Sequence, residues 1–281
     1  MAKVALVTDS TATISADLCK KYNIHAASQV VIWDEKTYKD GVDIQPKEFY
    51  ARLSTSKTMP STSQVAMVDF KNLYEKLHAE GYDILTVVLS QQLSQTYNSA
   101  NQAAGMIDGA NIEVIDSRSV AMGLGFNVLK AAKAAADGAS LADCKQLVEE
   151  SLPKAGVIIT PETLEYLHRG GRIGGGARFL GTALRMNPIL ELVDGRLEPV
   201  ERVRTRKKTL KRLVQLAGER IGGRTPLALS VVHANAEEEA KMLMETCKAT
   251  FSPEELSLNP VSPSIGTHTG PGTIGLAWLA G

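Results

Sequence analysis

Side chains with hydroxyl and amide groups gather in five short segments of the sequence, in which carboxylates are few. These segments are Thr8–Thr13, Ser61–Gln64, Ser90–Thr96, Asp116–Ser119 and Gly266–Gly272. Three of them follow apolar runs typical of strands, and the carboxyl ends of parallel strands meet at one edge of a sheet. Such hydroxyls, together with N–H groups at helix N-termini, bind an anion without a strong counter-charge. The pattern favours a carboxylate held in a dry pocket, although each serine or threonine is also a favoured helix N-cap.

Other residues that commonly carry out chemistry lack the spacing that their chemistry requires. The five histidines never pair at metal-ligand spacing, and only His268, beside Gly270–Pro271–Gly272, is a candidate for a binding site. The sequence contains no P-loop, no G-x-S-x-G elbow and no H-E-x-x-H motif. Gly123 and Gly125 lack the third glycine of a dinucleotide fingerprint and lie in a helical pattern, which favours a role in packing. The three cysteines are widely spaced, which argues against a disulfide framework and a zinc site.

Charge and hydrophobicity narrow the class of protein. The 281 residues include 31 Lys and Arg and 31 Asp and Glu, and this zero formal net charge disfavours a general nucleic-acid binder. No run of about 18 apolar residues occurs, and the apolar stretch near the N-terminus is too short for a signal peptide. We therefore expect a cytoplasmic protein without stable membrane insertion. Any lipid that it handles would be carried in a pocket.

Short apolar runs alternate with longer segments of helical periodicity, which predicts βαβ units and an α/β fold. Strands are predicted at Val4–Val7, His25–Ile32, Ile84–Leu89, Asn111–Ile115, Val157–Thr160, Ile189–Val193, Leu197–Val203, Leu227–Val232 and, last before a Gly-rich end, Leu256–Pro260. Helices are predicted at Ser15–Tyr22, Val68–Glu80, Ser94–Met106, Val120–Ala136, Leu141–Leu152, Thr205–Ile221 and Glu237–Phe251. Asp194–Gly195 predicts a hairpin between its two flanking strands.

The length of the chain suggests two α/β domains, residues 1–153 and 154–281, with a boundary near Pro153. The strand at Ile84–Leu89 is almost entirely apolar, which is typical of strands covered on both faces. We therefore expect mainly parallel sheets, with ligands at the carboxyl ends of their strands.

Seven motifs, taken together in their order and spacing, resemble the DegV family of bacterial fatty-acid-binding proteins along nearly the whole chain. They are VTDSTA at Val7–Ala12, STSQ at Ser61–Gln64, LSQQLSQTYNSA at Leu89–Ala100, VIDSRSVAMGLG at Val114–Gly125, LEYLHRGGRI at Leu164–Ile173, VRTRKK at Val203–Lys208 and GTHTGPGTIGL at Gly266–Leu276. The resemblance implies two α/β domains, with a lipid tunnel whose head-group site lies near their interface.

The resemblance also implies which residues bind the ligand. The family's fatty-acid carboxylate site matches Thr62, Ser94 and His268, and neighbouring residues could complete the network. These neighbours are Ser63, Gln64, Ser119 and Thr269. Studied members of the family form the lipid-binding subunit of a two-part fatty acid kinase, in which a partner resembling dihydroxyacetone kinase brings ATP and the product is an acyl phosphate.

In that family, arginines of the GGR and VRTR motifs are linked to partner docking or phosphotransfer, and they match Arg172 and Arg204. The resemblance thus implies a protein that is not itself an enzyme, with a long-chain fatty acid as ligand and no cofactor or metal. We expect a monomer.

Four residues depart from the family's usual pattern. Val65 stands where proline often follows the TSQ motif, and Gln91, Gln92 and Gln95 make the next motif unusually polar. Because they flank the head-group residues, we expect them to affect lipid preference more than lipid binding.

Two other functions are open at this stage. A lipid carrier or sensor without a kinase role would also bind fatty acid, but substitution of Arg172 or Arg204 would leave its function intact. A stand-alone sugar or ketone kinase would require a nucleotide motif or an acidic metal cluster, and the sequence has neither.

Overall fold

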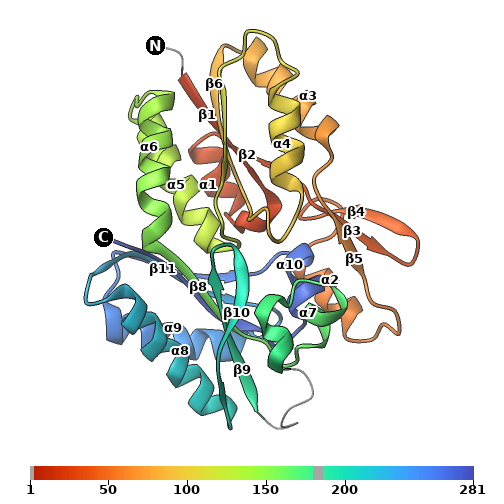
Figure 1. The fold of residues 1–281 in the computed structure, drawn as a ribbon, viewed down its shortest axis with the longest axis vertical. Helices are drawn as coiled ribbons and strands as arrows, with labels where there is room; N and C mark the ends of the chain where they lie inside the picture. The colour runs from red at the N-terminus through yellow and green to blue at the C-terminus, as the bar shows by residue number, and fades with distance from the viewer. Residues whose placement is uncertain (1–2, 180–185) are drawn as a thin grey trace.

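The computed structural model describes residues 3–179 and 186–281, which form three sheets and their covering helices (Figure 1). Most predicted elements are confirmed to within two residues at each end. Local signals explain several boundaries. Ser140 and Asp143 form a capping box at the start of one helix, and Gly222 ends another in the left-handed conformation.

The upper half of the molecule in Figure 1 contains a four-stranded parallel sheet, in the order β2-β1-β6-β7. Its strands are β1 (Lys3–Asp9), β2 (Ile24–Ala27), β6 (Tyr82–Val88) and β7 (Ile112–Asp116). Its helices are α1 (Ala16–Lys21), α3 (Met67–Ala79), α4 (Thr96–Ala104), α5 (Met122–Ala136) and α6 (Leu141–Ser151). Helices α3 and α4 lie on one side of this sheet, and α5 and α6 on the other (Figure 1). The predicted parallel α/β arrangement is confirmed here.

The lower half contains a six-stranded sheet, in the order β10-β9-β8-β13-β11-β12. Its strands are β8 (Ala155–Thr160), β9 (Asn187–Val193), β10 (Arg196–Val203), β11 (Pro226–His233), β12 (Glu255–Pro260) and β13 (Ile274–Ala280). Helices α8 (Arg206–Ile221) and α9 (Glu237–Phe251) pack against it. The prediction of mainly parallel strands is wrong for this sheet, because only the β11–β12 pair is parallel.

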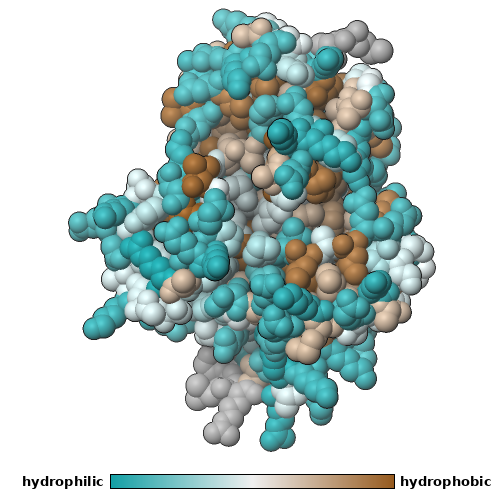
Figure 2. Space-filling model, turned by 180° about the vertical axis from the view of Figure 1, so that it is seen from behind, coloured by the Kyte–Doolittle hydropathy of each residue, from teal (hydrophilic) through white to brown (hydrophobic). Residues whose placement is uncertain are grey.

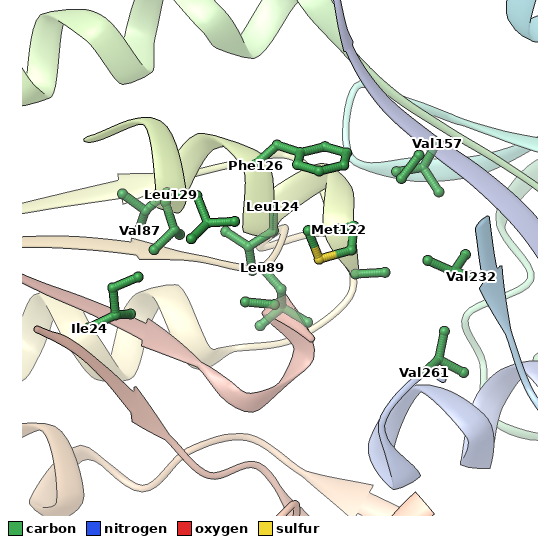
Figure 3. Close-up of a cluster of buried hydrophobic side chains, with 14 of the residues drawn as sticks. Ile24, Val87, Leu89, Met122, Leu124, Phe126, Leu129, Val157, Val232 and Val261 are labelled. Atoms are coloured by element: carbon green, nitrogen blue, oxygen red, sulfur yellow. The ribbon is translucent and has the colours of Figure 1, made fainter. Parts of the chain in front are cut away.

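Helix α5 lies between the two sheets and contacts both β1 of the upper sheet and β8 and β13 of the lower sheet. Figure 3 shows Leu124 and Leu129 of α5 near Val87, and Val157 of β8 beyond the start of the helix. Two glycines permit this close packing. A Cβ atom on Gly123 would lie 2.4 Å from Val157 Cγ2, and one on Gly125 would lie 2.5 Å from the carbonyl oxygen of Ala12. The predicted packing role of these glycines is therefore confirmed.

A smaller antiparallel sheet, in the order β4-β3-β5, lies at the side of the molecule. Its strands are β3 (Val30–Trp33), β4 (Lys36–Lys39) and β5 (Ser61–Ser63). Helices α2 (Pro46–Leu53) and α10 (Pro263–Thr269) lie close to it, and α7 (Glu165–Arg169) packs against α10. The short helices η1 (Ser10–Ala12), η2 (Leu152–Lys154) and η3 (Gly174–Phe179) complete the fold.

Three other features of the structure differ from the sequence analysis. Ser61–Ser63 forms strand β5, where no strand is predicted, and the predicted strand His25–Ile32 is divided between two sheets as β2 and β3. Leu256–Pro260 is not the last strand, because β13 follows it and lies inside the six-stranded sheet. The glycine and alanines of β13 are poor strand formers in isolation. Gly275 is nevertheless required there, since a Cβ atom would lie 2.7 Å from the carbonyl oxygen of Ile158.

The predicted hairpin at Asp194–Gly195 is confirmed, with φ values of 47° and 81° at its two turn residues. The predicted division into residues 1–153 and 154–281 stays a prediction. Within residues 3–179 and 186–281, no helix is long and apolar enough to cross a membrane.

We predict that Gly156→Ala destabilises the protein by about 1–3 kcal/mol, because a Cβ atom at Gly156 would lie 2.1 Å from the ring of Trp278 on β13. Denaturant unfolding measures the change. Gly105→Ala is the matched control, since the nearest atom to its Cβ would be 3.6 Å away. Equal stability of the two variants would contradict the tight β8–β13 packing.

Candidate functional site

An internal cavity lies between the carboxyl ends of β1 and β6, the start of α5, the six-stranded sheet and α10. The empty space inside it, together with the open solvent at its mouth, is about 1040 Å³. The apolar lining consists of Leu89, Leu93, Val120, Ala121, Val157, Ile159, Leu167, Leu197, Val232, Val261 and Ile265. Figure 3 shows four of these residues: Val157, Val232 and Val261 lie on the right of the view, and Leu89 lies nearer its centre. The molecular face in Figure 2 is mainly hydrophilic, with small hydrophobic groups, whereas the cavity is mainly apolar.

Thr62 and His268 meet in the wall of the cavity, although 206 positions separate them in the sequence. Thr62 lies on β5 opposite Val31, and His268 lies in the last turn of α10. The Thr62 Oγ1 and His268 Nε2 atoms are 2.7 Å apart. When the imidazole Nε2–H donates to Oγ1, the threonine hydroxyl is free to donate to an anion.

His268 is held in its neutral form. Burial lowers its pKa to about 4, and the positive charge of Arg172 acts in the same direction. Its Nδ1 atom is buried and has no hydrogen-bond partner among the described residues. The ring packs so closely on Gly170 that a Cβ atom there would lie 2.2 Å from Nδ1. The histidine therefore acts as a neutral hydrogen-bonding group rather than as a cation.

A hydrogen-bond chain positions Ser94 at the same cavity. The Ser94 and Thr96 hydroxyl oxygens are 3.0 Å apart, and Gln29 Nε2 donates to Thr96 Oγ1 at 2.9 Å. The backbone N–H of Val65 also donates to Thr96 Oγ1, at 3.3 Å. Val65, which departs from the family's usual proline, thus links β5 to the loop of Ser94 through a donor that proline lacks.

Asp9 joins the ends of β1 and β6 beneath the cavity. Its carboxylate accepts hydrogen bonds from the backbone N–H and hydroxyl of Thr11 and from the N–H of Leu89. Burial raises the pKa of Asp9, and these hydrogen bonds oppose that effect. Because Thr11 and Leu89 both line the cavity, Asp9 fixes part of its wall.

Arg172 reaches the cavity wall from the loop after α7. Its Nε donates to the carbonyl of Leu93 at 3.1 Å, and its Nη1 donates to the carbonyl of Gly170 at 2.6 Å. Both acceptors are neutral, and within residues 3–179 and 186–281 no carboxylate lies within 4.0 Å of this guanidinium. The arginine therefore brings a positive charge that its protein contacts leave uncompensated.

The other predicted site residues differ in position. Gln64 and Thr269 line the cavity, but the Thr269 hydroxyl donates to the carbonyl of Ile265. Ser63 and Ser119 do not line this cavity. Ser63 contacts Gln64, and Ser119 lines a separate pocket beside β7.

Arg204 is exposed at the opposite end of β10 from Arg196, roughly 25 Å away at strand spacing. Arg204 is not among the residues that line the cavity. Of the three unusual glutamines, only Gln95 lines the cavity.

Sequence reasoning missed residues that position the site. Gln29 is buried and bridges to Thr96, and it was detectable as a lone amide in an otherwise apolar run. His233 and Ser264 also line the cavity, but neither has a sequence pattern that would distinguish it. Among the residues that the structure describes, no group of three His, Cys, Asp or Glu side chains could hold a metal ion.

These features define a class of protein: an α/β protein with an internal, mainly apolar cavity that ends in neutral hydrogen-bonding groups beside an arginine. The DegV family model, described as an uncharacterised protein family, matches residues 3–281. The chain belongs to the DegV family.

Several relatives support this membership. Protein DegV of Bacillus subtilis is 33% identical over 277 residues, covering 98% of each chain. A DegV domain-containing protein of Clostridium acetobutylicum is 36% identical over 279 residues, covering 98% of this chain and 97% of the relative.

Solved structures show the same fold. A DegV family protein from Thermus thermophilus, described by its fatty acid binding, superposes with a TM-score of 0.93 at 31% identity over 99% of each chain. DegV of Bacillus subtilis, described as a fatty acid binding protein, gives a TM-score of 0.90 at 32% identity over the full length of both. The fold predicted from the family resemblance is confirmed.

We predict that His268 titrates with a pKa of about 4 in the ligand-free protein, because burial disfavours the imidazolium. Two-dimensional NMR of the imidazole rings measures it, with His268→Gln to assign the signal. The unfolded chain protonates at about 6.5, so the free energy of unfolding should fall by about 3 kcal/mol as the pH drops from 6.5 to 4. A His268 pKa near 6.5 would contradict the dry environment.

Proposed function

We propose that this protein binds one long-chain fatty acid, with the acyl chain in the apolar cavity and the carboxylate at Thr62, Ser94 and His268. One observation carries the proposal. The apolar cavity ends at the Thr62–His268 pair, whose neutral groups can hydrogen-bond an anion. The fatty acid binding described for the structures from Thermus thermophilus and Bacillus subtilis supports the same ligand.

The energetics of this arrangement favour a long acyl chain. Burial of about 14 methylene groups at roughly 0.8 kcal/mol each contributes about 11 kcal/mol before ordering costs. A carboxylate loses hydrogen bonds to water when it enters the site, and hydroxyl donors of the protein replace some of them. Arg172 adds a nearby positive charge. The head group therefore fixes the orientation of the ligand, while the chain supplies most of the affinity.

We propose further that the protein presents the bound fatty acid to a separate ATP-dependent kinase resembling dihydroxyacetone kinase. A carboxylate oxygen would attack the γ-phosphorus of ATP, the bond to the leaving ADP would break, and acyl phosphate and ADP would form. An ionised carboxylate needs no general base for this step, whereas positive charge near the phosphoryl group favours it. The uncompensated Arg172 beside the head-group site supports this role.

Arg204 is proposed to contact the kinase rather than the ligand, because it is exposed and does not line the cavity. A lipid carrier or sensor without a kinase is the second candidate function, favoured by the same cavity. The cytoplasmic location and the monomeric state stay predictions.

The binding proposal is tested first by mass spectrometry of the purified protein under native and then denaturing conditions. We expect one long-chain fatty acid per chain. A protein that contains none, and that also fails to bind added palmitate or oleate, would contradict the proposal.

Thr62→Ala and Ser94→Ala should each weaken palmitate binding about 10- to 100-fold, because each removes a hydrogen bond to a charged group worth roughly 1.5–3 kcal/mol. Titration calorimetry of delipidated protein measures this loss. Ser63→Ala is the matched control, since this neighbouring hydroxyl lies outside the cavity lining. Wild-type affinity in both Thr62→Ala and Ser94→Ala would show that the head-group assignment is wrong.

Arg172→Ala should lower acyl phosphate formation at least 10-fold while oleate binding changes less than about threefold, since charge is needed mainly in the transfer step. The assay combines oleate-loaded protein, Mg²⁺-ATP and a kinase subunit of the dihydroxyacetone kinase type, and traps the product as its hydroxamate. Arg224→Ala, at an exposed arginine near the end of α8, is the control. Undiminished hydroxamate formation by Arg172→Ala would favour the carrier function.

A further inference from the structure

A small recess lies next to the fatty-acid cavity and shares part of its wall. It is lined by Gln92, Leu93, Gly171, Arg172, Gly174, Arg196 and Leu197. Leu93, Arg172 and Leu197 line both spaces. Arg172 therefore borders both spaces: the recess, and the cavity that Thr62 and His268 also line.

Two guanidinium groups face this recess without an acidic partner. Arg196 donates from Nε and Nη2 to the side-chain oxygen of Gln92, at 2.9 and 2.7 Å, and Arg172 donates to two backbone carbonyls. All these acceptors are neutral, and within residues 3–179 and 186–281 neither guanidinium forms an ion pair. By contrast, three arginines on α8 do pair with glutamates. They are Arg206, Arg212 and Arg220.

Each arginine of the recess also keeps a terminal nitrogen without a hydrogen bond to the described residues: Nη2 of Arg172 and Nη1 of Arg196. Guanidinium groups match the oxygens of phosphate closely, and two of them balance a dianion. A single carboxylate would leave one of these charges uncompensated. The recess therefore fits a phosphoryl group better than a second carboxylate.

We propose that the recess is a phosphoryl subsite that holds the acyl phosphate product on this protein. The acyl chain stays in the cavity, its carbonyl group stays near Thr62 and Ser94, and the phosphoryl group lies between Arg172 and Arg196. This proposal rests on the proposed function. It assigns Arg196, rather than Arg204, to the phosphoryl group, because Arg204 lines neither the cavity nor the recess.

The β9–β10 hairpin holds Arg196 in position. The Ser90 hydroxyl donates to the carbonyl of Gly195 at 2.8 Å, and a Cβ atom at Gly195 would lie 2.2 Å from Ser90 Oγ. The turn therefore rests directly on the β6–α4 loop that carries Ser94. In Figure 1 this hairpin extends from the six-stranded sheet toward the four-stranded sheet. The loop and the hairpin together set the distance between head-group site and recess.

The test compares two ligands with the same chain: palmitate, and a stable analogue of palmitoyl phosphate in which a methylene replaces the anhydride oxygen (2-oxoheptadecyl phosphonate). Both are titrated into delipidated protein at low salt. Arg196→Gln should weaken phosphonate binding about 10-fold, the loss expected for one charged hydrogen-bond donor, and change palmitate binding less than threefold.

Two control variants separate charge from structure. Arg196→Lys loses the paired hydrogen bonds to Gln92 but keeps the positive charge, so a loss caused by a loosened hairpin would appear in it as well. Arg224→Gln removes an exposed arginine away from the recess. We expect phosphonate binding by both controls to stay within threefold of wild type.

Several outcomes would overturn the subsite. Phosphonate binding that Arg196→Gln leaves unchanged, or that Arg196→Lys weakens as much, would do so while palmitate binding still supports the proposed function. Inorganic phosphate that binds as tightly as the phosphonate would assign the recess to the free anion instead. Failure of wild-type protein to bind palmitate would contradict the proposed function itself.

Discussion

The packing of one buried helix between two sheets is the constraint on which the rest of this structure depends. Helix α5 approaches η1 and β8 so closely that Gly125 and Gly123 have no room for a Cβ atom. Ala121, just before the helix, has φ 52° and ψ −145°, a conformation rare for a residue other than glycine. Ala121 also lines the cavity. The position of α5 therefore sets both how the sheets meet and where the cavity begins.

The polar end of the cavity relies on neutral donors rather than on a buried ion pair. A neutral His268 avoids the desolvation cost that an imidazolium would incur there. Arg172, a cation beside this end of the cavity, is half-buried and held by backbone carbonyls, so its orientation does not depend on a ligand. A site of this kind is organised before a ligand arrives, which reduces the entropy cost of binding.

The elements around the cavity come from distant parts of the chain. Hydrogen bonds from Ser90 to Gly195 and from Arg196 to Gln92 attach the β9–β10 hairpin to the loop after β6. The Thr62–His268 contact similarly joins β5 to α10. Because each contact bridges two separate elements, a small shift between the sheets would change the shape of the cavity and of the recess together.

The sequence by itself determined the parallel βαβ half, the Asp194–Gly195 hairpin, the packing glycines of α5 and, through its motifs, the family. These features follow from local patterns of apolar residues, turn residues and glycine. Three features were decided by tertiary structure alone. They are the mainly antiparallel six-stranded sheet, the position of β13 between β8 and β11, and the presence of both Arg172 and Arg196 at one recess. Gly275 and Ala277 have weak strand propensity, and only the close approach of β8 and β11 explains them. Likewise, no sequence motif marks Arg196, because its position at the recess depends on contacts of the β9–β10 hairpin with the distant loop after β6.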